Sequence, residues 1–480
     1  MTESLHADIS ATLQPGFVGT AVPDWLVAAH ADGLVSVCLY GGNVTASHGL
    51  RRLCTDLRER LPGALLAVDE EGGDVTRLHY PVGSPTVGNA VLGRIDDEAT
   101  TASVATEIGG ELAAHGIGLD LAPVVDINSS PDNPVIGVRS FGAEAELVGR
   151  HGAAWVRGLQ DAGVAACAKH FPGHGDTAVD SHHGLPRITV PLDVLREREL
   201  LPFRAAVDAG VACVMTSHII VDALDPDRPA TFSPTVLRLL RDDLGFEGVI
   251  VSDALDMAGA SGATGIPEAA VLALFAGVDL LCLGSETTPE RYAAVHAGIV
   301  EAVRSGRLAA DRVAEAADRV RGLAERHDVS SSASAPSAPS APSAPSAPSA
   351  PRVTDEEVAG TFTVSDGFDA WRRDSSPAAV VQVETMSNLA VGAVAWGPAS
   401  LGAAVSSHEV PIGAKVAVVA RSIDASHPAH EVVAALRSAG HPVVLVECGW
   451  PRGGADVETR GGSPAVARAL LGLLGLGRET

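Results

Sequence analysis

The sequence predicts an α/β protein whose main part is a (β/α)8 barrel of the TIM type. Short β-branched runs alternate with amphipathic stretches of helical length, which is typical of a parallel sheet. The predicted strands are apolar throughout, and this indicates a sheet buried on both faces. Charged residues or histidines follow nearly every strand. A barrel builds its site from many strand ends, whereas a doubly wound sheet gathers ligands at one switch point, so the barrel is favoured.

Seven strands are predicted in the first part of the chain. They lie at residues 34–40, 64–68, 119–126, 164–168, 211–216, 248–251 and 278–283. Helices are predicted between them, at residues 98–115, 143–162, 192–209, 267–276 and 289–305. Neither a GxGxxG motif after the first strand nor a Walker-type GxxxxGK[ST] motif occurs, which argues against a nucleotide-binding sheet.

A low-complexity segment divides the chain. Six consecutive Ser-Ala-Pro triplets begin at Ser334, and such a composition forms no core and prefers an extended, semi-rigid path. We therefore predict a barrel domain over residues 1–329, a linker over 330–352 and a small α/β domain over 353–480. In this last part, strands are predicted at 379–383, 416–419 and 443–446, and helices at 428–440 and 464–474.

The charge balance limits the possible partners. The chain carries 34 Lys and Arg residues against 59 Asp and Glu, a formal charge of −25, which argues against nucleic acid and membrane surfaces. Its N-terminus lacks a basic start followed by an apolar run, and the charge-free stretch 385–407 is interrupted by Ser, Asn, Pro and Gly. We therefore expect a cytoplasmic protein. Its six cysteines form no CxxC pair and are expected to be reduced core thiols.

The densest group of reactive side chains is KHFPGHGDTAVDSHHGLP, residues 169–186, directly after a predicted strand. A metal site is one interpretation, with His170, His174, Asp176, Asp180 and His182 as ligands, although their spacing matches no HExxH or paired CxxC pattern. In the other, Asp180 and His182 form an acid/base pair, because residues two apart in an extended loop point the same way. Polar residues that only satisfy a loop remain a third interpretation.

A further carboxylate, Asp253, follows the apolar strand of VIVSDALDM. An aspartate at a strand end is more often a helix N-cap. Opposite a proton donor such as His182, it would instead suit the nucleophile of retaining glycoside hydrolysis. Candidate groups for positioning a ligand are Asp69, Arg77, Arg139 and Lys169. Each alone is typical of a structural salt bridge, but together at strand ends they favour a hydroxyl-rich ligand.

These residues lie in segments that resemble the catalytic barrel of glycoside hydrolase family 3, in its β-N-acetylhexosaminidase branch. The segments are VDEEGGDVTRL from Val68, LAPVVDINSSPDNPVIGVRSFG from Leu121, KHFPGHGDTAVDSHHGLP from Lys169, MTSHIIVDALDPDRPATFS from Met215 and VSDALDM from Val251. The resemblance implies that Asp253 is the nucleophile and that His182, tuned by Asp180, is the acid/base. It also implies that the terminal N-acetylglucosamine is bound by Asp69, Arg77, Arg139, Lys169 and His170.

The function implied is that of a retaining exo-β-N-acetylglucosaminidase that needs no metal or organic cofactor. Family membership suggests small muropeptide or chitooligosaccharide fragments as substrates, in peptidoglycan turnover or amino-sugar uptake. Two alternatives stay open. A histidine acid/base leaves less negative charge at the mouth of the barrel than a glutamate would, so phosphate could replace water as the acceptor. The enzyme would then be a phosphorylase. A catalytically silent sugar-binding protein would use the same pocket.

The chain departs from the family pattern in three places. Glu70-Glu71-Gly72-Gly73-Asp74 stands where the family usually has Gln-Glu-Gly-Gly-Arg, which replaces a cation with an anion near Asp69. We expect this anion to weaken sugar binding or to shift aglycone preference. Ala254 stands where many relatives have a second aspartate. The C-terminal part resembles a shortened version of the family's α/β sandwich domain, and its brief tail argues against a substrate-contacting role.

Overall fold

The computed structural model describes residues 3–44, 47–177, 185–262, 264–328, 353–384 and 390–477. Six strands of the first domain form one curled, parallel sheet in the order β10-β7-β5-β4-β3-β2. They are β2 (Ser36–Cys38), β3 (Leu65–Val68), β4 (Leu119–Asp120), β5 (Ala165–Phe171), β7 (Cys213–Thr216) and β10 (Val249–Val251). Each corresponds to a predicted strand, and the parallel sheet is thereby confirmed.

A parallel pair of short strands, β1 (Leu13–Gln14) and β11 (Leu281–Cys282), connects the two edges of this sheet. On one side, the Cys38 amide donates to the Pro15 carbonyl at 3.0 Å, and on the other Val251 forms a parallel bridge with Leu280. The strands therefore close into a TIM-like barrel. Strand β1 was not predicted, because two residues are too few to show a pattern.

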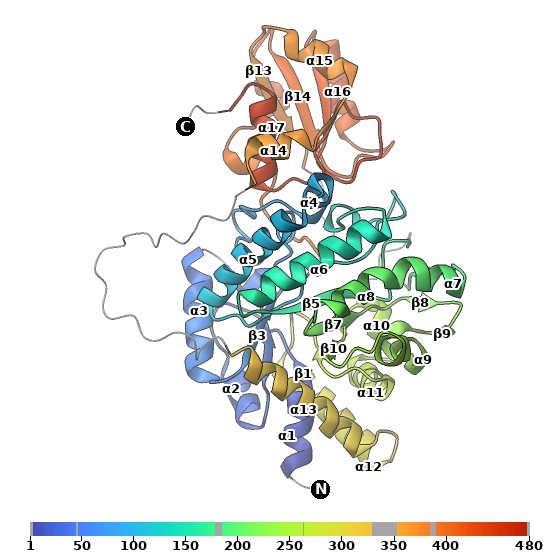
Figure 1. Ribbon diagram of the computed structural model, residues 1–480. Coiled ribbons are helices and arrows are strands. Elements are labelled where there is room, and N and C mark those ends of the chain that lie inside the picture. The colour runs from blue at the N-terminus through green and yellow to red at the C-terminus, as the bar shows by residue number, and fades with distance from the viewer. Residues whose placement is uncertain are drawn as a thin grey trace.

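Helices cover the outside of the barrel (Figure 1). They are α1 (Glu3–Ala11), α2 (Asp24–Ala31), α3 (Ser47–Arg60), α4 (Asn89–Ile95), α5 (Glu98–His115), α6 (Ala145–Asp161), α9 (Pro234–Arg238), α11 (Ile266–Ala276), α12 (Pro289–Arg304) and α13 (Ala310–Arg326). The short α10 (Ala258–Ser261) lies instead at the mouth of the barrel, where Ala258 and Ser261 line a cavity. The predicted helix 192–209 is divided into α7 (Leu192–Val194), a π-helical turn (Leu195–Glu199) and α8 (Leu200–Asp208). A small sheet of β6 (Arg187–Ile188), β8 (Ile220–Val221) and β9 (Asp225–Pro229) lies beside them.

Two apolar layers hold the barrel together. Inward-facing residues of neighbouring strands fill its interior, including Leu65, Leu119, Cys167, Cys213 and Val249, and a larger cluster lies between the sheet and the helices. All six cysteines are free and buried, which confirms the expectation of core thiols.

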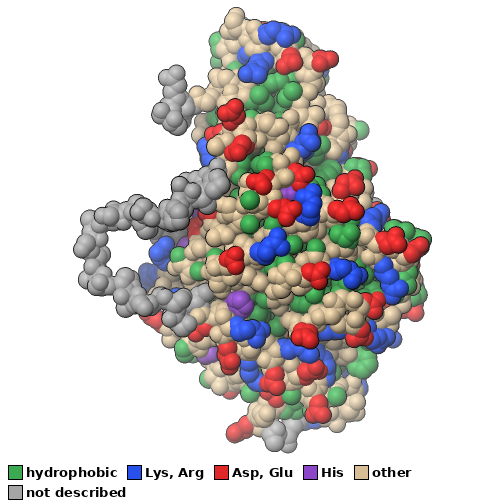
Figure 2. Space-filling view, in the orientation of Figure 1, with side chains coloured by type: hydrophobic (Ala, Val, Ile, Leu, Met, Phe, Trp, Pro, Cys, Tyr) green, Lys and Arg blue, Asp and Glu red, His purple; other side chains and the backbone are tan. Residues whose placement is uncertain are grey.

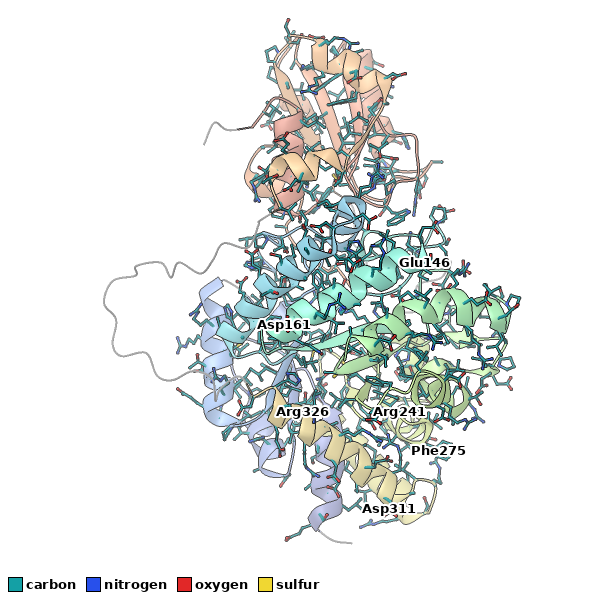
Figure 3. The ribbon with its side chains drawn as sticks, viewed as in Figure 1. Glu146, Asp161, Arg241, Phe275, Asp311 and Arg326 are labelled. Carbon is teal, nitrogen blue, oxygen red and sulfur yellow. The ribbon has the colours of Figure 1, made fainter. Side chains whose placement is uncertain are left out.

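The base of the barrel carries a buried charge cluster. Asp279, just before β11, is paired with Arg241, Arg312 and Arg319, and Figure 3 shows Arg241 near α13, on which Asp311 and Arg326 are labelled. Charge at this end of a barrel serves stability.

The C-terminal domain is a second parallel sheet with one antiparallel edge strand. Its order is β12 (Thr363–Val364), β16 (Val457–Glu458), β15 (Val443–Glu447), β14 (Lys415–Ala420) and β13 (Ala378–Gln382). Its helices are α14 (Asp355–Gly360), α15 (Asp366–Arg373), α16 (Ala429–Ser438) and α17 (Pro464–Leu473). Helix α17 contributes Ala465, Val466 and Ala469 to the apolar cluster of the barrel. The domain therefore packs directly on the barrel end near α4 (Figure 1).

Within the described ranges, no helix is both long and apolar enough to cross a bilayer. Acidic and basic side chains are interspersed over the face shown in Figure 2. The predicted linker, 330–352, lies outside the described residues.

Candidate active site

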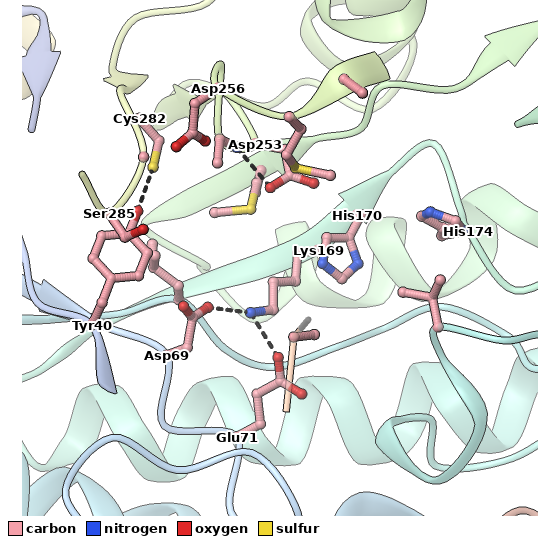
Figure 4. Close-up of a pocket in the computed structure, with 18 of the residues that line it drawn as sticks. Tyr40, Asp69, Glu71, Lys169, His170, His174, Asp253, Asp256, Cys282 and Ser285 are labelled. Carbon is pink, nitrogen blue, oxygen red and sulfur yellow. Dashed lines mark hydrogen bonds and ion pairs between the residues drawn. The ribbon is translucent and has the colours of Figure 1, made fainter. Parts of the chain in front are cut away.

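A cavity of about 570 Å³ opens at the carboxyl ends of the barrel strands (Figure 4). Residues that follow or end six different strands line it, namely Tyr40, Asp69, Lys169, Met215, Asp253 and Cys282. Active sites of TIM barrels are built at this end, from residues of several strands. The barrel was predicted because polar residues follow many strands, and the tertiary structure brings several of these residues together in one cavity.

Lys169 lies at the centre of the cavity wall, between two carboxylates. Its Nζ donates to Asp69 Oδ1 at 2.7 Å and forms an ion pair with Glu71 Oε1 at 2.8 Å. Burial alone would lower the pKa of Lys169, but Asp69 and Glu71 raise it above its usual value. The ammonium group is therefore fully charged at neutral pH.

Glu71 is the second bridging group, and the sequence reasoning assigned it no role. Arg139 binds it in a bidentate manner, with Nε at 2.9 Å from Oε2 and Nη2 at 2.8 Å from Oε1. Burial by itself would raise the pKa of Glu71, but Arg139 and Lys169 hold it well below the usual range. The sequence offered one signal for a role of Glu71. It lies two residues after Asp69, and carboxylates at strand ends are expected to lie at the mouth of the barrel.

Arg77 reaches the cavity from the loop that follows β3. Its Nη2 lies 3.8 Å from Asp69 Oδ2 and donates to the Ala390 carbonyl at 2.8 Å. Ala390 belongs to the C-terminal domain and lines the cavity. The brief C-terminal tail argued against a substrate-contacting role for this domain, but the domain packs on the mouth of the barrel and supplies Ala390 to the cavity wall.

His170 faces the cavity beside Lys169, because the register of β5 shifts between Lys169 and Phe171. Its Nδ1 lies 2.7 Å from Asp126 Oδ2, so the carboxylate accepts from a protonated Nδ1. The Asp126 carboxylate also accepts from the amide of His174 at 2.7 Å. Asp126 therefore fixes both the ring of His170 and the start of the loop that follows.

His174 lies on that loop, with Nδ1 at 2.7 Å from Thr177 Oγ1. Burial lowers its pKa to about 4, so the ring is neutral at physiological pH. Asp176 pairs with Arg198 at 2.6 Å. Among the described residues, no group of three or more His, Cys, Asp or Glu side chains is arranged so that it could hold a metal ion. Asp180 and His182 lie outside the described residues, so their acid/base pairing stays a prediction.

Asp253 lies just after β10, and its Oδ1 accepts from the Ala254 amide at 2.7 Å. The next helix, α10, begins only at Ala258, and Met257 occupies its N-cap position. Asp253 is therefore not a helix cap, and its carboxylate lines the cavity instead. Asp256 lines the same wall (Figure 4), and burial raises the pKa of Asp256.

Asp74 does not line this cavity, contrary to expectation. Its Oδ1 accepts from the Gly462 amide at 2.8 Å, and its Oδ2 lies 3.9 Å from Arg421 Nη1. Both partners belong to the C-terminal domain. Sequence reasoning alone had placed this anion near Asp69 because the two residues are close in the chain, but the intervening turn points them in different directions.

Comparison with known proteins agrees with this architecture. Residues 20–323 match the family model for the glycosyl hydrolase family 3 N terminal domain. The chain belongs to glycoside hydrolase family 3. The family predicted from the five sequence segments is thereby confirmed, and with it the place of the chain among the glycoside hydrolases.

Similar proteins carry hexosaminidase names. The chain is 35% identical over 312 residues to beta-hexosaminidase A of Pseudoalteromonas piscicida, covering 61% of this chain and 52% of that protein. It is 39% identical over 264 residues to a beta-hexosaminidase of Alkalilimnicola ehrlichii, covering 53% of this chain and 75% of that protein. The chain thus spans about half to three quarters of the length of these relatives.

One solved structure is similar over both domains. It is a glycoside hydrolase family 3 beta-N-acetylglucosaminidase from Paenibacillus sp. str. FPU-7, with a TM-score of 0.84 and 30% identity. The alignment covers 100% of this chain and 97% of that one, so the likeness includes the C-terminal domain as well as the barrel.

Proposed function

We propose that this protein is a retaining exo-β-N-acetylglucosaminidase. The observation that carries the proposal is the position of Asp253, whose carboxylate lines the same cavity as Asp69, Lys169 and Arg139. A nucleophilic carboxylate beside fixed hydrogen-bonding groups suits glycoside chemistry. The hexosaminidase names of the similar proteins support the choice of sugar.

The paired charges of the cavity wall would hold the terminal sugar. The side chain of Asp69 is 18% exposed while that of Lys169 is 2% exposed, so the lysine acts mainly by fixing the carboxylate, which accepts from sugar hydroxyls. Arg77, Arg139 and His170 line the same wall and supply N–H donors. Because these groups hold one another in place before substrate arrives, little ordering is needed on binding.

The reaction would proceed in two displacements. In the first, an Asp253 oxygen bonds to the anomeric carbon as the bond to the aglycone oxygen breaks, and His182 donates a proton to that oxygen. In the second, His182 removes a proton from water, whose oxygen displaces the Asp253 carboxylate and releases the sugar. Asp180 would stabilise the imidazolium form of His182 between the two steps.

We further propose a cytoplasmic role on small chitooligosaccharide or muropeptide fragments, including those from peptidoglycan turnover. Neutral or weakly charged saccharides are compatible with the acidic chain, whose formal charge is −25.

Covalent trapping tests the proposal directly. A fluorinated N-acetylhexosamine inactivator followed by peptide mapping should label Asp253. The matched control is Asp256→Asn, which removes the neighbouring carboxylate of the same cavity wall and should still be labelled at Asp253. Label on any other residue of the wild type would overturn the assignment.

Turnover measurements separate the alternatives. On a chromogenic N-acetylglucosaminide, Asp253→Asn should lose roughly three orders of magnitude in kcat or more, because no covalent intermediate can form. Equal turnover by the variant and the wild type would exclude this mechanism, and absence of turnover in both would favour a silent binding protein. Sugar 1-phosphate released in millimolar phosphate would identify a phosphorylase.

A further inference from the structure

We propose that Asp74 is a positioning residue, which couples the packing of the C-terminal domain to the placement of Arg77 in the sugar site. This inference rests on the proposed function, because Arg77 is taken to contact the sugar. It assigns a role to a domain for which the sequence indicated none, and to a residue whose identity departs from the family pattern.

Asp74 is the buried polar contact between the barrel and the start of α17. It is 8% exposed and accepts from the Gly462 amide at 2.8 Å, while Arg421 lies 3.9 Å away and stacks on Trp396 at 4.1 Å from its ring centroid. Burial raises the pKa of Asp74, whereas Arg421 and the amides of Gly462 and Ser463 oppose the rise. The N-terminal end of a helix also favours an acceptor at this place.

These partners explain why an anion stands here. An arginine at position 74 would bring a second guanidinium to the one at Arg421, and it offers no acceptor to the two backbone amides. The aspartate therefore fits this C-terminal domain, and the departure from the family's usual arginine is a docking feature.

The loop that carries Asp74 also carries Arg77, and it is clamped as one unit. Glu70 Oε2 accepts from Thr76 Oγ1 at 2.8 Å, from the Arg77 amide at 2.8 Å and from the Leu78 amide at 2.9 Å. Asp74 lies within the turn closed by the Gly72–Val75 bridge, directly before the clamped residues, so we expect a displacement at Asp74 to reach Arg77, three residues further on.

The same loop meets the segment that contains Ala390. The Ala390 carbonyl accepts from Arg77 Nη2 at 2.8 Å, and the Ala393 amide donates to the Tyr80 hydroxyl at 2.9 Å. Val75 packs with Val391 and Val394 in a small buried cluster. The C-terminal domain thus holds the guanidinium of Arg77 on one side while Asp69 lies on the other, and both Ala390 and Arg77 line the cavity.

Enzyme kinetics and hydrogen exchange of the full chain test the coupling. In Asp74→Ala we expect KM for a chromogenic N-acetylglucosaminide to rise about tenfold with kcat changed less than threefold, because binding is affected rather than bond cleavage. Amide exchange should accelerate in peptides covering both 70–83 and 390–396. Asp74→Asn retains an acceptor for Gly462 and should keep KM near that of the wild type.

Arg452→Ala is the matched control, because Arg452 Nε also joins the two domains, at 3.1 Å from the Pro131 carbonyl, but touches neither the loop nor Arg77. It should leave KM unchanged. Faster exchange in Asp74→Ala with unaltered KM would overturn the positioning role.

If Asp74→Ala does not fold, Gly462→Ala perturbs the contact from the other side, since an added Cβ would lie 2.9 Å from Trp396. The same rise in KM is expected, and a folded variant with unchanged KM contradicts the proposal. An inactive wild type would instead refute the proposed function, and the exchange comparison would still decide whether Asp74 couples the domain to the loop.

Discussion

The two lysines of the chain, Lys169 and Lys415, are both buried, but their ammonium groups have different kinds of partner. Lys169 is 2% exposed and forms its contacts with two carboxylates that line an open cavity. Lys415 is 7% exposed, and its Nζ donates to the carbonyls of Trp371, Arg372 and Asp374 at 3.2, 3.3 and 2.6 Å. Lys169 therefore holds carboxylate side chains in place around the cavity, whereas the hydrogen bonds of the Lys415 ammonium go to backbone carbonyls.

The local structure explains the difference. Lys415 starts β14 and caps the last carbonyls of α15, with its ammonium also 4.5 Å from the centroid of the Trp371 ring. Lys169 lies near the end of β5, where the barrel opens. A buried charge is therefore a poor indicator of function by itself. A buried charged residue indicates a functional site only if the groups it contacts still present hydrogen-bond donors or acceptors to a cavity.

The largest effect is expected for Lys169→Met. Loss of the ammonium leaves Asp69 and Glu71 facing each other without their shared partner, so unfolding should become easier by about 3–5 kcal/mol. We also expect kcat/KM to fall at least about a hundredfold. Lys169→Arg keeps the charge without the point geometry and should be intermediate. Full activity in Lys169→Met would remove the distinction between the two lysines.

A second test concerns His174, the buried imidazole on the loop that follows β5. Because the folded-state pKa of His174 is about 4 and its ordinary value is 6.5, the unfolded chain binds a proton first as the pH falls. Stability present above pH 6.5 should therefore be lost between pH 6.5 and 4, by on the order of 3 kcal/mol. Urea titrations at several pH values should show a flatter dependence in His174→Gln. Identical slopes in the variant and the wild type would show that this ring is not a buried neutral group.

The smallest effect is expected for Lys415→Met. It removes donors from three carbonyls that can partly be rehydrated, so the free energy of unfolding should fall by about 1–2 kcal/mol. Because no atom of Lys415 approaches the cavity, kcat/KM should stay within about twofold of the wild type. Thermal melts and the chromogenic assay measure both quantities. A drop in kcat/KM as large as that of Lys169→Met would contradict the inference that Lys415, unlike Lys169, serves only the stability of the C-terminal domain.

Much of the fold followed from the sequence, because apolar strands and amphipathic helices have clear periods. Helix α5 has the predicted bounds, Glu98–His115, and Lys169, Asp69, Arg139 and Asp253 meet at one mouth as expected for strand ends. Short strands such as β1 escaped prediction because pairing, rather than local pattern, makes them strands.

The sequence by itself determined the alternating strands and helices, the family and the identity of the charged strand-end residues. Those properties depend on residue type and spacing along the chain. Only the tertiary structure decided that Glu71 bridges Lys169 and Arg139, that Asp74 turns toward Gly462, and that Ala390 lines the cavity. The physical reason is that side-chain direction in a loop and contact between domains depend on partners hundreds of residues away, which local periodicity does not encode.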